Sequence, residues 1–280
     1  MEVYYRKKGG EWERGKGLWE ALSLDSRRKP GEQEHPGAPF VICLAGAGGK
    51  TSCLRRLAWE GRERNMPPVV ITTTHIYRPS AFAALNLGPG ETARMAKDQG
   101  LAVAGCPGKD GKLSFPGWDW YEDLCGQTGL ILAEADGSRR LPIKTSGPCE
   151  PVIPANTSLI LCVLGLSALG RPLEQVCFRL ERALKILGKG PQEPVGERDM
   201  ERLMAEGYLR PLREAYPRAA VVPVFHQADG MEPGGNRPAG IEALHADAMW
   251  ETGMRMLDHM GEQEGIVSGG LLGDPSRTLF

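Results

Sequence analysis

The chain has 280 residues, of which 41% are hydrophobic and 25% are charged, and this composition is typical of globular proteins rather than of disordered or fibrous ones. Its 34 Lys and Arg residues are balanced by 35 Asp and Glu residues, which argues against a dedicated nucleic-acid-binding protein. No apolar run approaches the roughly 18 residues of a membrane span, and the first residues lack an apolar signal core. We therefore expect a cytoplasmic protein with neither a membrane nor a nucleic-acid partner.

Seven cysteines are present, an odd number, and no two of them form a CxxC pair. Several lie inside apolar runs, as in Val41-Ile42-Cys43-Leu44, and this predicts small hydrophobic side chains in a reducing compartment. Cys149 lies in a polar stretch, so a redox or metal role remains the alternative for that residue.

Residues 1–37 are charged and rich in glycine, and they end in a stretch of Pro, Gly and Glu. This pattern predicts an N-terminal arm with loop character, followed by one nucleotide-binding domain over residues 38–280. Within the arm, Trp12, Trp19 and Leu22 are predicted to form one short amphipathic face that packs on the main domain.

The first predicted unit of the main domain is a buried strand at 41–45, a helix from 51 to about 64 and a second strand at 69–73. Together they form a βαβ unit with a right-handed crossover. Further strands are predicted at 101–104, 112–115, 129–133, 159–164, 219–225 and 265–268, and helices at 173–187, 197–206 and 239–261. Apolar strands that alternate with helices predict an α/β fold, a three-layer P-loop NTPase-like arrangement in which helices cover both faces of a mostly parallel sheet.

A glycine-rich turn separates the first strand from its helix, and there backbone N–H groups and the positive end of the helix dipole favour an anion. Leu44 stands where the standard phosphate loop has its first glycine, so the loop is a shortened form. Lys50 is predicted to reach the β- and γ-phosphates, and the Thr51 hydroxyl to ligate Mg²⁺. The alternative is a tight glycine turn before an ordinary helix start. The predicted nucleotide-binding residues are Gly46, Ala47, Gly48, Gly49, Lys50, Thr51 and Ser52.

Two carboxylates, Glu134 and Asp136, follow the buried strand at 129–133. Side chains two residues apart in an extended chain point to the same face, and open α/β sheets bind ligands at the carboxyl ends of their strands. One carboxylate is predicted to hold Mg²⁺ and the other to position a nucleophile, so Thr51, Glu134 and Asp136 are the predicted metal residues. An N-cap or turn aspartate beside a solvated glutamate is the alternative.

Polar residues at two neighbouring places extend this prediction. Thr72, Thr73 and Thr74 close the second strand, where their hydroxyls serve either packing or the water shell of a metal. Arg139, Arg140 and Lys144 follow the acidic turn, and a cation there can offset charge on a transferring phosphoryl group. The predicted catalytic residues are Lys50, Glu134, Asp136, Lys144 and Arg139.

The strand at 219–225 ends in Phe225-His226-Gln227-Ala228-Asp229. GTP-binding proteins carry an Asn-Lys-x-Asp string at this place, of which only Asp229 is present here. Asp229 is therefore either a contact to the nucleotide base or a turn aspartate, and the choice between ATP and GTP stays open.

Taken together, these blocks resemble the selenium-dependent hydroxylase accessory protein family (YqeC-like). The resemblance rests on residues 45–51, 70–74, 134–144 and 150–154, with 163–173 and Arg179 after them, and it spans about residues 40–260. It implies a nucleotide-binding factor that helps to mature a selenium-dependent molybdenum hydroxylase, with that hydroxylase or its cofactor as the partner. The chain departs from the family at His226-Gln227, where members often carry a string more like Asn-Lys, and in its longer N-terminal arm.

Three functions follow as hypotheses. The first is a Mg²⁺-dependent accessory protein that binds ATP or GTP and hydrolyses it slowly. A second is a kinase or nucleotidyl or phosphoryl transferase that acts on a pterin or a selenium compound and binds its acceptor near 72–74 and 137–150. The third is a scaffold that binds a partner hydroxylase and catalyses nothing.

Overall fold

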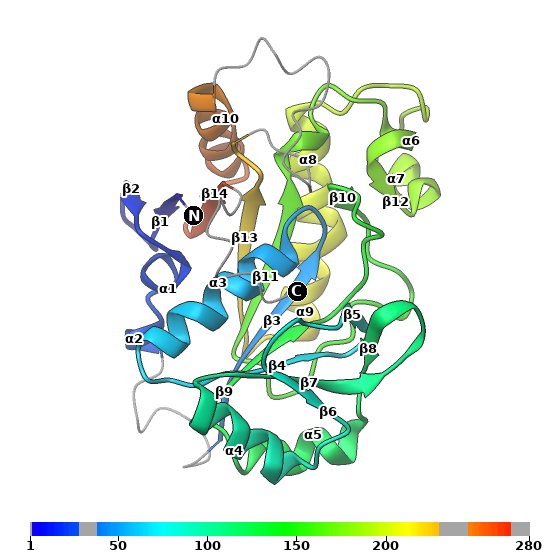
Figure 1. The fold of residues 1–280 in the computed structure, drawn as a ribbon. Helices are drawn as coiled ribbons and strands as arrows, with labels where there is room; N and C mark the ends of the chain where they lie inside the picture. The colour runs from blue at the N-terminus through cyan, green and yellow to red at the C-terminus, as the bar shows by residue number, and fades with distance from the viewer. Residues whose placement is uncertain (1, 28–37, 230–245, 270–280) are drawn as a thin grey trace.

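A computed structural model of the chain describes residues 2–27, 38–229 and 246–269. One large mixed sheet lies between two layers of helices, as the sequence predicts (Figure 1). The strands of this sheet are β1 (Val3–Arg6), β2 (Trp12–Gly15), β3 (Phe40–Gly46), β4 (Val69–Thr72), β5 (His75–Tyr77), β6 (Ala83–Leu85), β7 (Ala102–Pro107), β8 (Lys112–Ser114), β9 (Leu130–Glu134), β11 (Leu159–Gly165), β13 (Ala220–His226) and β14 (Gly265–Ser268).

The strand order is β2-β1-β14-β13-β11-β3-β9-β4-β7-β8-β5, and β6 pairs with β7. The central strands from β14 to β7 are parallel, whereas β1, β2, β5 and β8 pair antiparallel at the two ends. Strand β3 is therefore flanked by β9 and β11, and the carboxyl ends of these three strands meet at one edge of the sheet. Ligands of open parallel sheets bind at this edge.

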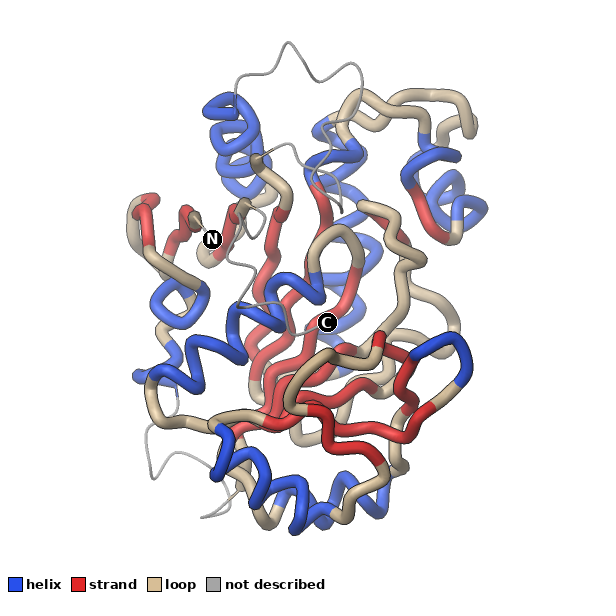
Figure 2. The backbone as a smooth tube through the Cα atoms, in the orientation of Figure 1, coloured by secondary structure: helices blue, strands red, loops and turns tan. Residues whose placement is uncertain are grey.

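Ten α-helices are found in the described residues: α1 (Leu18–Ala21), α2 (Leu24–Arg27), α3 (Lys50–Glu63), α4 (Pro89–Gln99), α5 (Trp118–Cys125), α6 (Leu173–Val176), α7 (Leu180–Leu187), α8 (Glu197–Met204), α9 (Arg210–Ala215) and α10 (Ala246–His259). A π-helical segment, η3 (Ala205–Leu209), joins α8 to α9. Figures 1 and 2 show α3 in front of the central strands, with α8 and α9 behind them.

The period-2 alternation of β3 explains these two layers. Ile42 and Leu44 pack with Leu54 and Leu57 of α3 in one core cluster. Val41 and Cys43 belong to the other cluster, which includes Met200, Leu203 and Tyr208 of the α8–η3 segment. All seven residues of β3 are buried, as expected for a strand covered on both faces.

The loop character predicted for the N-terminal arm is wrong for residues 3–27. Strand β1 pairs antiparallel with β14, so this segment extends the main sheet, and α1 packs on α3. Trp19 and Leu22 are buried in the cluster around α3, but Trp12 packs against the other cluster, so the three do not share one face. Residues 28–37, which precede the predicted boundary at 37/38, lie outside the described residues.

Three predicted helices differ from the observed ones. The helix predicted at 173–187 is interrupted by β12 (Cys177–Phe178), which pairs with β10 (Ile143–Lys144), and by Arg179 with its φ of 63°. The helix predicted at 197–206 continues through η3 and α9 to Ala215. The first part of the helix predicted at 239–261 lies outside the described residues, and α10 supplies the rest. Helices α4 and α5 were not predicted, because α4 has few apolar residues and α5 is only eight residues long.

All seven cysteines are free thiols. Cys43, Cys53, Cys162 and Cys177 are buried, and burial raises the pKa of the Cys43 and Cys53 thiols to about 12. These residues therefore pack as small neutral side chains, as predicted. Cys149 is exposed.

Candidate functional site

The glycine-rich turn between β3 and α3 packs closely against neighbouring segments. Gly48 has a φ of +69°, and a Cβ there would lie 2.3 Å from the Pro142 carbonyl oxygen. Gly49 has a φ of +144°, and its Cβ would lie 1.7 Å from Cδ2 of His226. Only glycine fits both positions, because side chains are excluded by the backbone angle and by the close neighbours. The sequence of the turn is therefore set by packing as well as by any ligand.

The N-terminus of α3 leaves backbone donors at the end of this turn. The N–H of Cys53 donates to the Gly49 carbonyl at 2.9 Å, which is the first helical hydrogen bond. The N–H groups of Lys50, Thr51 and Ser52 precede that bond, so they have no acceptor within the helix. Earlier in the turn, the Ala47 N–H donates to the Val163 carbonyl at 2.8 Å. An anion at this helix start would meet three N–H groups and the positive end of the dipole.

The Lys50 side chain bends back into the turn. Its Nζ donates to the Gly46 carbonyl at 2.5 Å and lies 3.2 Å from Oδ1 of Asp136. The side chain is only 3% exposed. The turn therefore brings a buried ammonium, paired with Asp136, next to three N–H groups that have no acceptor within the helix.

Thr51 and Glu134 meet at the carboxyl end of the sheet. The Thr51 hydroxyl donates to Oε2 of Glu134 at 3.1 Å, because β9 lies next to β3. Burial raises the pKa of the Glu134 carboxyl, while the charge of Lys50 and the Thr51 hydrogen bond act in the opposite direction. A hydroxyl and a carboxylate in contact are hard oxygen donors of the kind that Mg²⁺ takes, together with water and phosphate.

The second predicted carboxylate, Asp136, lies at the base of the turn instead of beside Thr51. Both of its oxygens accept from the Gly46 N–H at 3.1 Å, and Oδ2 lies 2.8 Å from Nζ of Lys144. With Lys50 on Oδ1, the carboxylate is fully engaged by protein groups. Since β9 ends at Glu134, the two acids do not continue one extended strand, and they face different partners.

Asp136 begins a chain of alternating charges. Lys144 is completely buried, and its Nζ also contacts the Gly137 carbonyl at 2.7 Å and Oε2 of Glu150 at 3.3 Å. Nη2 of Arg179 then lies 2.6 Å from the same Glu150 oxygen. All three ammonium hydrogens of Lys144 thus have acceptors within the protein, so the structure gives this residue a positioning role.

Of the three threonines after β4, two have hydroxyl partners. The Thr72 hydroxyl donates to the Glu134 carbonyl at 3.2 Å, and the Thr73 hydroxyl donates to the Val152 carbonyl at 2.7 Å. The Thr74 hydroxyl is buried and has no partner. Packing therefore accounts for Thr72 and Thr73, and Thr74 is the one of the three that is open to a further contact.

Arg139 and Arg140 form the tip of the turn between β9 and β10. Both side chains are exposed, and both residues have positive φ angles. The Arg139 guanidinium lies 5.0 Å from the centre of the Phe178 ring, and that of Arg140 lies 4.9 Å from the Tyr77 ring. Aromatic rings, rather than carboxylates, thus position both cations.

The residues after β13 support the turn from the side. Nδ1 of His226 lies 2.8 Å from the Ser268 hydroxyl, and its ring lies against Gly49. The Ser167 hydroxyl donates to Oε1 of Gln227 at 2.6 Å. The sequence showed only that these two residues depart from Asn-Lys, and their packing role depends on contacts across the sheet. Asp229 follows at a half-buried position, and its role as a base contact stays a prediction.

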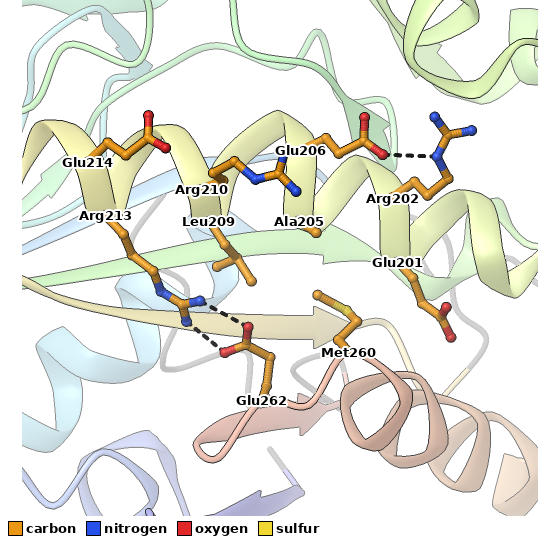
Figure 3. Close-up of a pocket in the computed structure, with 10 residues that line it drawn as sticks. All are labelled: Glu201, Arg202, Ala205, Glu206, Leu209, Arg210, Arg213, Glu214, Met260 and Glu262. Atoms are coloured by element: carbon orange, nitrogen blue, oxygen red, sulfur yellow. Dashed lines mark hydrogen bonds and ion pairs between the residues drawn. The ribbon is translucent and has the colours of Figure 1, made fainter.

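A separate surface hollow lies between the α8–η3–α9 segment and the turn after α10 (Figure 3). Leu209 and Met260 form its apolar part, and Arg213 makes two hydrogen bonds to Glu262 at 3.0 and 2.6 Å. None of the predicted site residues lines it. Its charged side chains are largely paired with one another, and the hollow gives no support to a second catalytic centre.

The described ranges contain neither a membrane-spanning helix nor a ready-made metal cluster. No helix within residues 2–27, 38–229 and 246–269 combines the length and apolarity that a bilayer crossing requires. In the same ranges, no cluster of three or more His, Cys, Asp or Glu side chains is placed to bind a metal ion. A metal at Thr51 and Glu134 would therefore need ligands from water or from a bound molecule.

Comparison with known proteins gave two matches. The family described as "YqeC protein" matches residues 42–181, which is half of the chain. A curated relative from Escherichia coli (strain K12), described as "Uncharacterized protein YqeC", is 30% identical over 138 residues. The alignment covers 47% of this chain and 54% of the relative, so the chain spans about half the length of the curated relative that it matches. The matched region contains the turn, Glu134, Asp136, Lys144 and Arg179.

Proposed function

The chain belongs to the YqeC protein family, and we propose that it binds ATP or GTP together with Mg²⁺ and hydrolyses the nucleotide slowly. In this proposal it acts as an accessory protein in the maturation of a selenium-dependent molybdenum hydroxylase. The observation that supports nucleotide binding is the start of α3. There, three backbone N–H groups without helical acceptors, the Lys50 ammonium and a Thr51–Glu134 pair lie within one turn of helix and one neighbouring strand.

In this proposal the N–H groups of residues 50–52 and the Lys50 ammonium hold the phosphates. Lys50 exchanges its bond to Asp136 for a bond to phosphate, and Asp136 keeps Lys144 and the Gly46 N–H as partners. The carboxylate at the base of the turn is then never left unpaired. Lys144 therefore serves to keep the turn in shape while Lys50 changes partner.

Thr51 and Glu134 fit a magnesium ion by the chemistry of their oxygen atoms. A bound Mg²⁺ would supply Lewis-acid stabilisation of phosphate charge. Glu134 is buried, so a nearby cation would compensate the cost of holding its carboxylate ionised. The unpartnered Thr74 hydroxyl, two residues beyond the end of β4, is available to the same water shell.

Isothermal titration calorimetry with ATP, GTP and CTP, each with Mg²⁺ or with a chelator, tests the proposal. We expect one of the purine nucleotides to bind in the presence of Mg²⁺, and Lys50→Ala to weaken that binding about 10- to 100-fold, since a charged hydrogen bond is lost. Lys97→Ala, which removes an exposed lysine of α4, is the matched control and should change nothing. Unchanged affinity in Lys50→Ala, with a native circular dichroism spectrum, would refute the proposal.

The accessory role is supported by the family alone and needs its own experiment. We expect cells that lack the chain to make a selenium-dependent molybdenum hydroxylase as inactive protein, and wild-type chain to restore its activity. Lys50→Ala should fail to restore it, whereas Lys97→Ala should restore it fully. Restoration by Lys50→Ala would show that nucleotide binding is not needed for the role.

A further inference from the structure

We propose that a second oxyanion site lies beside the phosphate-binding turn, formed by the hydroxyl of Tyr208 and the guanidinium groups of Arg179 and Arg139, and that it receives a free oxyanion of the size of inorganic phosphate. The inference rests on the proposed function, because hydrolysis of a nucleoside triphosphate releases such an ion next to this place.

Two buried polar groups without partners point to a ligand here. The Tyr208 hydroxyl and Nη1 of Arg179 are both buried, and neither has a hydrogen-bond partner in the structure. Burial raises the pKa of Tyr208 well above its ordinary value, so the group is a neutral donor. The Tyr208 hydroxyl also interacts electrostatically with Asp136 and with Arg179, which places it near the charged chain. Leaving buried donors unpaired costs stability, and a bound ion or water is one of the explanations for such groups in native proteins.

The position of Tyr208 has its own structural origin. Tyr208 lies in η3, the π-helical segment that joins α8 to α9, and single π-helical turns within α-helices occur often at functional sites. The side chain is completely buried among apolar residues such as Met204 and Leu209. Phenylalanine would fill the same space without an unpaired hydroxyl, so packing does not explain the choice of tyrosine.

The charges near Phe178 favour an anion. Four cations (Lys50, Lys144, Arg179 and Arg139) accompany the two carboxylates of Asp136 and Glu150. The proposed function assigns Lys50 to the nucleotide and the third nearby carboxylate, Glu134, to Mg²⁺, so the remaining three cations exceed the remaining two carboxylates by one charge. Arg139 and Arg179 both lie on the Phe178 ring, with guanidinium carbons 5.0 and 5.3 Å from its centre. Arg139 is exposed and has no carboxylate partner among the described residues, so it can meet an incoming ion.

The site is adjacent to the phosphate-binding turn and is partly covered by the chain around Gly147. The loop that carries Arg139 packs on the turn, because the Pro142 carbonyl lies against Gly48. A Cβ on Gly147 would lie 2.0 Å from Nη1 of Arg179, so the segment around Gly147 lies close against the guanidinium. Such a covered place suits a free oxyanion better than an ester with a large organic group.

The test is calorimetric titration of inorganic phosphate into protein saturated with Mg²⁺ and with ADP or GDP, according to which of the two purine nucleotides binds. We expect one phosphate to bind, and Tyr208→Phe and Arg139→Ala each to weaken its binding about tenfold. Arg140→Ala is the matched control, since Arg140 is the neighbouring exposed arginine and lies on Tyr77 instead; it should bind phosphate within about twofold of wild type. Glycerol 3-phosphate should bind more weakly than inorganic phosphate, and tighter binding would overturn the assignment to a free ion.

The Tyr208→Phe variant also distinguishes a ligand-binding role of the hydroxyl from a structural role. Because the hydroxyl has no partner, the variant should melt at the wild-type temperature or above and bind nucleotide normally. Wild-type phosphate affinity in Tyr208→Phe would overturn the site and leave a buried water as the partner of the hydroxyl. If neither ADP nor GDP binds together with Mg²⁺, the proposed function fails. Phosphate is then titrated into the Lys50→Ala variant and into the Lys50→Ala, Tyr208→Phe double variant. A tenfold lower phosphate affinity in the double variant supports the second site, and absence of phosphate binding to Lys50→Ala overturns it.

Discussion

The ammonium group of Lys144 lies 2.8 Å from Oδ2 of Asp136, and neither side chain is exposed to solvent. A buried ion pair is costly to desolvate, and its net contribution to stability is small, but removal of one partner leaves the other charge buried and unpaired. Lys144 has a second carboxylate partner in Glu150. Its loss would therefore leave two acids behind, one of them at the base of the phosphate-binding turn.

Lys144→Ala is accordingly expected to lower the free energy of unfolding by about 3–5 kcal/mol, as measured by urea denaturation at pH 7.5. The exposed Lys185→Ala on α7 is the control, with an expected change within about 0.5 kcal/mol. A loss below about 1 kcal/mol for Lys144→Ala would contradict the continuous chain from Asp136 to Arg179.

Replacement of Glu134 is expected to raise the stability of the folded protein, in contrast to replacement of Lys144. Since burial raises its pKa from 4.5, the folded protein binds the Glu134 proton more tightly than the unfolded chain does. Stability is then lost as the pH rises from the unfolded pKa through the folded one. Glutamine keeps an oxygen that can accept from Thr51 but has no proton to lose.

Glu134→Gln should therefore be more stable than wild type at pH 8, and the difference should close as the pH falls toward 4. Chemical denaturation across this range measures the effect. The same variant should lose the dependence of nucleotide binding on Mg²⁺. A Glu134→Gln variant that is less stable than wild type at pH 8 would mean that the carboxylate is stabilised in the folded protein.

Much of the central fold was predictable, because strands that are buried on both faces have continuous apolar sequences. β3, β9, β11 and β13 are such runs, and their predicted ranges agree with the structure within two residues. The helical pattern after the Gly-Gly-Lys-Thr string likewise predicted α3. Thr51 and Glu134 were predicted to share a metal ion, and the structure shows a hydrogen bond between them. The short strands β1 and β2 at one end of the sheet were missed, since four-residue strands with alternating or exposed residues give no such signal.

Contacts between distant segments were beyond prediction. Nothing in the local sequence places His226 against Gly49 or Tyr208 near Asp136, because these pairs form only when parallel strands and their helices are assembled. The different hydrogen-bond partners of Glu134 and Asp136 were not predicted either. Their two-residue spacing assumes a strand that continues past 134, whereas β9 ends there.

The N-terminal segment is expected to contribute strongly to stability. Trp19 is almost completely buried, and its backbone N–H donates to Oε2 of Glu60 on α3 at 2.7 Å. Trp19→Ala should lower the free energy of unfolding by about 3–5 kcal/mol, as large core truncations do. Trp118→Ala is the matched control, because this indole is exposed and should cost about 1 kcal/mol or less. Equal losses in the two variants would argue that α1 is not packed on α3.

His226 couples the phosphate-binding turn to pH. Burial lowers the pKa of its imidazole from 6.5 to about 4, although the charge of Asp229 acts in the opposite direction. The unfolded chain takes up this proton first as the pH falls below about 6.5, so stability declines between pH 6.5 and 4 by roughly 3 kcal/mol from this group alone. His226→Asn should show a smaller decline over the same range in chemical denaturation. It should also weaken nucleotide binding, because the ring that lies against Gly49 is lost. An imidazole whose carbon-bound protons titrate near pH 6.5 in the NMR spectrum of the folded protein would contradict its burial beneath the turn.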